Sequence, residues 1–178
     1  MKSPRYTGVA IALHWLMAAM LIGLLAVGFI MHGLPFSPFK LKIYSWHKWA
    51  GVSVFLLAWL RLAWRAGHRP PALPAAMGAL TRALAHLGHA ALYLLMIVIP
   101  LSGWLMSSAK GVPTVYFGVL PLPDLIAPDP RLGERLQFVH MTLNFLLIAV
   151  VAGHVAAALK HHLFDKDDVL KRMLPWRS

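Results

Sequence analysis

The 178-residue chain contains no cysteine and only six carboxylate side chains. Without cysteine it cannot form disulfides, hold an iron–sulfur cluster through thiolates or attach a c-type haem covalently. The six carboxylates all lie outside the long apolar runs. This argues against a zinc or di-iron site inside those runs, because such sites gather several ligands at one level, usually with carboxylates. A metal cofactor must therefore depend on histidine or methionine.

Charged residues are also scarce, at 13% of the chain against 59% apolar residues. This composition cannot cover a soluble domain with a polar surface, but it suits a multi-span membrane protein. Crossing a bilayer as a helix takes about 20 mostly apolar residues. We expect one all-α domain over residues 1–178, a four-transmembrane-helix bundle with spans at about 8–31, 43–64, 84–107 and 136–159.

The first apolar run follows Lys2 and Arg5, as the apolar run of a signal peptide would. It is too long for a signal peptide, and no small-residue cleavage site follows it. We therefore expect it to be the first span.

The basic residues explain the net charge of +11 without a nucleic acid partner, because they flank the apolar spans. Eleven fall on one side of the expected bundle and six on the other. By the positive-inside rule, the richer side and both termini face the cytoplasm. The richer side has Lys2, Arg5, Arg61, Arg65, Arg69, Arg82, Lys160, Lys166, Lys171, Arg172 and Arg177, and the other has Lys40, Lys42, Lys48, Lys110, Arg131 and Arg135.

Prolines mark the connections. The segment 65–76 is expected to be a solvated linker, and Pro100 with Gly103 to shape a kink in the third span. The loop 109–135 holds five prolines and has the length typical of a functional loop. Residues 160–178 indicate a short basic amphipathic tail on the inner membrane surface.

Ten histidines are many for so apolar a chain, and four fall inside the expected spans. Ionisable groups inside a membrane are costly and indicate a functional site. His14 and His154 each lie about six residues, roughly 9 Å, from the cytoplasmic end of their spans. His47 and His140 both lie near the outer start of theirs. The four therefore form two pairs, one in each leaflet.

Two imidazoles facing each other at each of two levels would hold two bis-histidine haems, because haem iron accepts axial histidine without a covalent link. His140 and His154 are 14 residues apart, on one face of a heptad-like helix. Gly51, one turn from His47, and Gly153 would leave room for a macrocycle. The alternative, histidines that only donate hydrogen bonds between helices, fits the paired depths less well.

The remaining histidines leave more than one role open. His86 and His89 share a face near the inner end of the third span, where they would line a quinone pocket, replace a ligand or reach the interface. Asn144, one turn from His140, would support that histidine or bond between helices. The others are expected at the interface, in a loop or without an evident partner: His161, His162, His68 and His32.

Several segments together resemble the prokaryotic di-haem cytochrome b561 family over nearly the whole chain. The resemblance implies a multi-pass protein of the bacterial inner membrane with two non-covalent b haems, one on His14 and His154 and one on His47 and His140. The chain departs from the family's usual pattern at HKWAG and at His140-Met141, which leaves the outer-side substrate open. The matching segments are RYTGVAIALHWLMA (5–18), HKWAGVSVFLLAWLRLAWR (47–65), HRPPALP (68–74), AHLGHAALYLLMIVIPLSGWLM (85–106) and GHVAAALKHHLFDKDDVLKRMLP (153–175).

The stand-alone members that the chain most resembles look like superoxide oxidases. This implies an oxidoreductase that passes electrons from periplasmic superoxide to ubiquinone. The same haem layout occurs in cytochrome subunits of hydrogenases and formate dehydrogenases. A subunit that relays electrons for a partner dehydrogenase is therefore one alternative, and a haem-free small membrane carrier is another.

The resemblance also suggests roles for charged and titratable residues. Arg5, Arg61 and Arg65 would pair with haem propionates, whose carboxylates match the guanidinium fork. A cationic mouth would raise the encounter rate of a small anion such as superoxide. Topology and ordinary loop solvation explain the same charges without a ligand. The candidate proton donors to quinone are His86, His89 and His161, and the candidate steering residues are Lys40, Lys42, Lys48, Lys110, Arg131 and Arg135.

Overall fold

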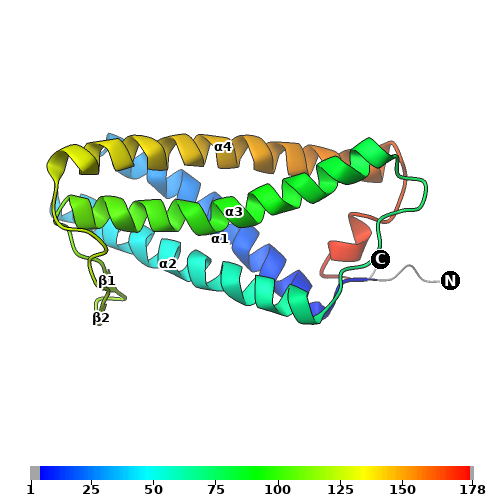
Figure 1. Ribbon diagram of the computed structural model, residues 1–178, viewed down its shortest axis with the longest axis horizontal. Helices are drawn as coiled ribbons and strands as arrows, with labels where there is room; N and C mark the ends of the chain where they lie inside the picture. The colour runs from blue at the N-terminus through cyan, green and yellow to red at the C-terminus, as the bar shows by residue number, and fades with distance from the viewer. Residues whose placement is uncertain (1–4, 177–178) are drawn as a thin grey trace.

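The structure, a computed structural model, describes residues 5–176, so Lys2 and Arg177 of the charge pattern lie outside the described residues. Within this range, four long helices run lengthwise through the molecule (Figure 1). An antiparallel pair of two-residue strands lies between the third and fourth helix, and a 3-10 helix follows the fourth. The elements are α1 (Gly8–Gly33), α2 (Pro38–Gly67), α3 (Ala79–Ala109), β1 (Val115–Tyr116), β2 (Leu120–Pro121), α4 (Pro130–Leu163) and η1 (Lys171–Met173).

Local capping signals determine where three of the helices begin. The side-chain oxygens of Thr7, Ser37 and Asp129 each accept a hydrogen bond from a backbone N–H in the first turn of the helix that follows. Pro38 and Pro130 stand at the start of α2 and α4, where a missing N–H costs nothing. Each helix contains the span expected for it and is longer, because the caps lie outside the apolar runs.

Three of these helices, α1, α3 and α4, are long and apolar enough to cross a membrane. α2 has a comparable length but carries Lys40, Lys42 and Lys48 in its first half and Arg61 and Arg65 near its end. Large apolar side chains are exposed along all four helices. Such a surface suits contact with lipid rather than water. The count of four spans stays a prediction.

The helices pack in chain order. α3 packs most extensively on α4, and α2 contacts both α1 and α3, whereas the backbones of α1 and α4 approach each other much less. This spacing leaves room for large side chains between α1 and α4. Small apolar clusters fill the middle of the bundle. One contains Met17, Val54, Ala58 and Met96, and another contains Leu95, Ile99 and Leu147.

The bundle has two distinct ends (Figure 1). α1 begins and α4 ends at one of them, the terminal end. α2 begins and α3 ends at the other, the hairpin end, where β1 and β2 lie. α3 runs through Pro100 without a break and bends along its length, as expected where a proline removes a helical hydrogen bond.

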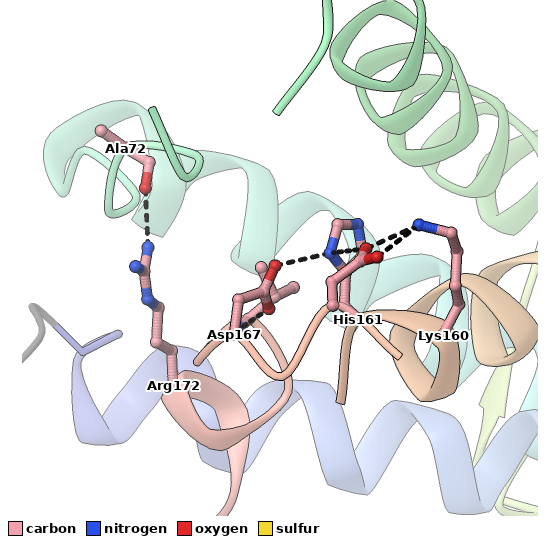
Figure 2. A network of polar contacts seen from close by, with 7 residues as sticks. Ala72, Lys160, His161, Asp167 and Arg172 are labelled. Atoms are coloured by element: carbon pink, nitrogen blue, oxygen red, sulfur yellow. Dashed lines mark hydrogen bonds and ion pairs between the residues drawn. The ribbon is translucent and has the colours of Figure 1, made fainter. Parts of the chain in front are cut away.

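The segment after α4 folds back onto the terminal end. Arg172 Nη1 donates to the Ala72 carbonyl at 2.7 Å, across the connection between α2 and α3 (Figure 2). Trp15 Nε1 donates to the Met173 carbonyl at 2.8 Å. Because α4 continues to Leu163, the first residues of the expected tail belong to that helix, and the only further helical turn is η1 among the described residues.

Candidate functional site

At the hairpin end, His47 of α2 and His140 of α4 line one cavity of about 320 Å³. All four helices contribute to its walls, which are mostly apolar, and Lys110 and His32 also line it. Both histidines further line a smaller pocket that reaches the central core. The structure therefore brings together the two histidines that share the outer level of the sequence pattern.

Two glycines lie directly against these imidazole rings. A Cβ atom at Gly28 would lie 3.6 Å from Cε1 of His47. A Cβ atom at Gly103 would lie 3.1 Å from Cε1 and 3.4 Å from Nδ1 of His140. α3 can approach His140 this closely because position 103 has no side chain. A Cβ atom at Gly51 would meet nothing within 4 Å, so the space beside that residue is open.

Ser102 determines the orientation of the His140 ring. Its Oγ donates to the Ile99 carbonyl at 2.7 Å and lies 2.9 Å from His140 Nδ1, which is itself 3.1 Å from the same carbonyl. Nδ1 therefore donates, since the hydroxyl hydrogen is already used and the carbonyl only accepts. Nε2 keeps its lone pair, as a metal ligand requires. Asn144 Nδ2 donates to the His140 backbone carbonyl at 2.7 Å.

His47 has a different environment. Its Nδ1 is buried and has no hydrogen-bond partner among the described residues. Buried polar atoms are rarely left unpaired in folded proteins. An orphaned imidazole nitrogen on a cavity wall is typical of a binding site rather than of packed interior.

At the terminal end, three histidines meet. His154 of α4 lies between His14 of α1 and His89 of α3, with ring centroids 6.2 Å and 5.6 Å away. Metal–imidazole bonds of about 2.0 Å on both sides of a metal place two axial ring centroids about 6 Å apart. The separation of His14 and His154 suits two ligands of one metal. His86 is exposed.

Two guanidinium groups of α2 reach the same place. Arg61 Nη2 lies 3.1 Å from His14 Nδ1. Arg61 and Arg65 also lie 5.6 and 5.9 Å from the centre of the Tyr93 ring. Neither arginine forms an ion pair with a carboxylate in the described part of the chain. Two permanent charges without a counter-ion favour an anionic ligand here. Arg5 instead donates to the Leu174 carbonyl.

The contact between Arg61 and His14 has a chemical consequence. Guanidinium only donates, so Nδ1 of His14 accepts, and the proton of a neutral His14 lies on Nε2. Ligation of a metal through Nε2 requires the opposite tautomer. Arg61 would then have to exchange His14 for another acceptor, such as a carboxylate.

His161 is buried, and it pairs with the segment after α4 rather than with the three histidines. Its Nδ1 lies 2.6 Å from Oδ2 of Asp167 and 3.1 Å from Oδ2 of Asp165, and Figure 2 shows this network. Lys160 donates to Asp165, and this hydrogen bond lowers the pKa of the exposed Asp165 carboxyl.

The six cations expected to steer an anion differ in their contacts. Lys110 lines the cavity of His47 and His140, and its ammonium donates to the Gln137 side chain. Arg131 and Arg135 are exposed in the first turns of α4. The other three have local partners: Lys40 the Leu34 carbonyl, Lys42 the Trp46 ring, and Lys48 the Val112 and Pro113 carbonyls.

Neither Gly28 nor Ser102 is among the residues expected at a site from the sequence, and Gly103 is expected only to shape the kink. Each is a small residue at the level of a histidine on another helix. Small residues at the depth of an intramembrane histidine would have been a usable signal, since only they let a helix pass close to an imidazole.

The profile of the family described as prokaryotic cytochrome b561 matches residues 5–176. The chain belongs to the prokaryotic cytochrome b561 family. Members of this family are membrane electron carriers that bind b-type haem, so the family expected from the sequence is confirmed.

Relatives of this cytochrome b561 chain are similar over much of their length. It is 35% identical over 171 residues to cytochrome b561 homolog 2 of Escherichia coli (strain K12), covering 96% of this chain and 91% of the relative. It is 27% identical over 172 residues to the probable superoxide oxidase CybB of Yersinia pestis, covering 96% of both. Cytochrome b561 homolog 1 of Escherichia coli (strain K12) is 28% identical over 132 residues, 74% of each chain.

The residues at both ends fit a b-type haem, which is held by side chains without a covalent link. The hairpin end offers a cavity, two histidines and a glycine against each ring. The terminal end offers His14 and His154 at a suitable separation, with Arg61 and Arg65 nearby, neither of which has a carboxylate partner among residues 5–176.

Proposed function

We propose that this cytochrome b561 protein binds two b haems, crosses the bacterial inner membrane four times with both termini in the cytoplasm, and oxidises periplasmic superoxide with ubiquinone as acceptor. Two superoxide anions each lose one electron and become oxygen. Ubiquinone takes up those two electrons and two protons and becomes ubiquinol, so atoms and charge balance.

The observation that carries the proposal is the meeting of histidines at two levels. His14 and His154 would hold one haem, and His47 and His140 the other. Haem b, when bound, supplies a one-electron carrier whose potential depends on the axial imidazoles and their hydrogen bonds. Ser102 keeps His140 Nδ1 protonated and its Nε2 available.

The arginines at the terminal end would hold the carboxylates of the haem there. Arg61 and Arg65 both lie near the Tyr93 ring and lack acidic partners among the described residues. Arg61 would turn from His14 toward a propionate and so release His14 Nδ1 for the tautomer that ligates iron.

The proton donors for quinone would lie at the terminal end. His89 is next to His154, and His86 lies one turn away on the same helix. His161, held by Asp167, would take protons from the aqueous side. This assignment follows the paired depths of the histidines and the expected cytoplasmic side.

The donor side would be the hairpin end, where the name of the Yersinia pestis relative supports superoxide as donor. Lys110 lines the cavity, and Arg131 and Arg135 are exposed nearby on α4. Cations at the mouth of a site raise the encounter rate of a small anion, and this effect weakens with added salt.

The test is an optical spectrum of the purified protein, reduced with dithionite and then with superoxide. Sharp b-type bands, with about two haems per chain by pyridine haemochrome, are expected. Superoxide should reduce the haems, and ubiquinone should reoxidise them. A protein without haem overturns the proposal. Two haems that superoxide does not reduce would leave a cytochrome that serves another donor, such as a partner dehydrogenase.

A further inference from the structure

The segment 112–123, between α3 and α4, contains no charged residue and three prolines. It forms the hairpin of β1 and β2. The side chains of Phe117, Val119 and Leu120 at its tip are 60%, 84% and 56% exposed. Turns in contact with water are usually built from small polar residues and glycine. This tip is apolar, which calls for a physical explanation.

The hairpin is fastened to one flank of α2 through polar side chains of that helix. Lys48 Nζ donates to the carbonyls of Val112 and Pro113 at 3.0 and 3.4 Å. Trp49 Nε1 donates to the carbonyl of Val115 at 2.6 Å. The hairpin backbone thus provides acceptors for the side-chain donors of Lys48 and Trp49. A lipid tail has no acceptor to offer them.

The contact between the hairpin and α2 extends one turn further, to Ser53. Ser53 Oγ lies 2.8 Å from the Tyr116 hydroxyl, and the ring centroids of Trp49 and Phe117 are 5.4 Å apart. Figure 1 shows the strands beside the flank of the bundle rather than over its end. The hairpin therefore lies alongside a helix of the bundle, level with the third to fifth turns of α2.

The tip is a tight turn with an unusual residue in it. Phe117 and Gly118 have φ angles of +51° and +73°, in the left-handed region. A bulky residue such as Phe117 rarely takes this conformation, because its Cβ crowds the backbone. Packing of the Phe117 ring on Trp49 compensates for the unfavourable angle. The tip is held in place by α2 and is not a free loop.

These contacts also explain how α2, with its lower hydropathy, sits beside three apolar helices. At about 100° per residue, Lys48, Trp49 and Ser53 all lie on the half of α2 that is turned away from His47. Polar side chains on a flank that meets lipid are costly. The hairpin covers them and exposes Phe117 and its apolar neighbours in their place.

We propose that the hairpin binds the lipid bilayer: it lies in the interfacial layer of the leaflet at the hairpin end, with Phe117–Leu120 in contact with lipid. The two short strands have open edges, which exclude the hydrocarbon centre but not the interface. Pro113, Pro121 and Pro123 reduce the number of unpaired N–H groups. Tryptophan and tyrosine, here Trp49 and Tyr116, favour the same layer. The proposal does not depend on the haem assignment.

The absence of cysteine makes a direct test simple. A nitroxide spin label on Val119→Cys, in the full-length protein in lipid nanodiscs, reports access to oxygen and to a water-soluble nickel chelate. The matched control is Ala127→Cys, an exposed residue of the same connection. We expect the label at 119 to be reached several-fold better by oxygen than by nickel, relative to the control. Leu120→Cys should give the same result.

Three other outcomes would overturn the proposal. Equal nickel access at 119 and 127 would place the tip in water. If neither oxygen nor the nickel chelate reaches the labels at 119 and 120 well, and the labels do not couple to one another, then protein buries the tip. Dipolar broadening at 119 that disappears on dilution with unlabelled protein would mean that a second copy covers it. Circular dichroism of each variant checks that the helices are retained.

Discussion

The two histidine groups of this molecule differ in what surrounds their rings. At the hairpin end, His47 and His140 line a cavity, glycines abut both rings, and Ser102 orients one of them. At the terminal end, His14 and His154 are already about as close as two axial ligands, and arginine contacts one of them. Small residues surround one histidine group, and a charged residue contacts the other.

If each group binds a haem as proposed, one cofactor would be held by two physical means within one bundle. Space beside a ring is made by omitting side chains, which leaves the histidines free to turn unless a hydrogen bond fixes them. Permanent charges instead attract the anionic edge of a ligand, which the guanidinium fork matches. The two sites should therefore fail for different reasons.

The largest expected effect is the loss of one haem. His47→Ala and His14→Ala should each lower the haem content from about two to about one per chain, because each removes an axial ligand. Pyridine haemochrome measures the content, and redox titration shows which haem remains. His89→Ala is the matched control and should keep both haems. A loss of haem in that control would make His89 a ligand and break the proposed pairing.

A side chain at Gly103 should damage the hairpin-end site alone. Gly103→Val would push on His140, since even a Cβ atom would lie 3.1 Å from its ring, and overpacking costs about 1–3 kcal/mol. Gly88→Val is the control in the same helix, where a Cβ atom meets nothing within 4 Å. We expect haem content to fall with the first change and not the second. If both changes lowered the haem content equally, the cause would be the changed helix propensity of α3 and not the space beside the His140 ring.

For haem affinity, charge should matter only at the terminal end. Arg61→Gln removes a hydrogen bond to a charged group, worth about 1.5–3 kcal/mol, which corresponds to a roughly tenfold or greater loss of affinity for that haem. Titration of the haem-depleted protein with haem measures this affinity. Arg82→Gln, an exposed cation at the same end that contacts the Met77 carbonyl, should have no effect. Unchanged affinity in Arg61→Gln would remove the proposed propionate partner.

The smallest effect is expected at Ser102. In Ser102→Ala, His140 Nδ1 keeps the Ile99 carbonyl at 3.1 Å but loses the hydroxyl acceptor. The ring becomes a weaker donor to iron, so the midpoint potential of that haem should rise, by about 20–60 mV if the bond is worth about 0.5–1.5 kcal/mol. The other haem should keep its potential, and Ser102→Thr should restore the original value. A shift in both haems would point to a general change in structure.

Much of the fold was predictable, and for a simple reason. Long apolar runs with polar ends can satisfy their backbone only as helices, so all four helices appear where the sequence places them. Depth follows from the rise per residue, and so the structure brings His14 to His154 and His47 into one cavity with His140. The hairpin escaped prediction, because its two-residue strands leave no periodic pattern.

The amino-acid sequence by itself determined the helical class, the family and the levels of the histidines, since each depends on local composition and on position along a chain of known geometry. Only the tertiary structure decided which neighbours surround each ring. Gly103 and Ser102 reach His140 from another helix, Arg61 reaches His14, and the hairpin covers one flank of α2. Such contacts depend on the rotation and spacing of packed helices, which no single segment specifies.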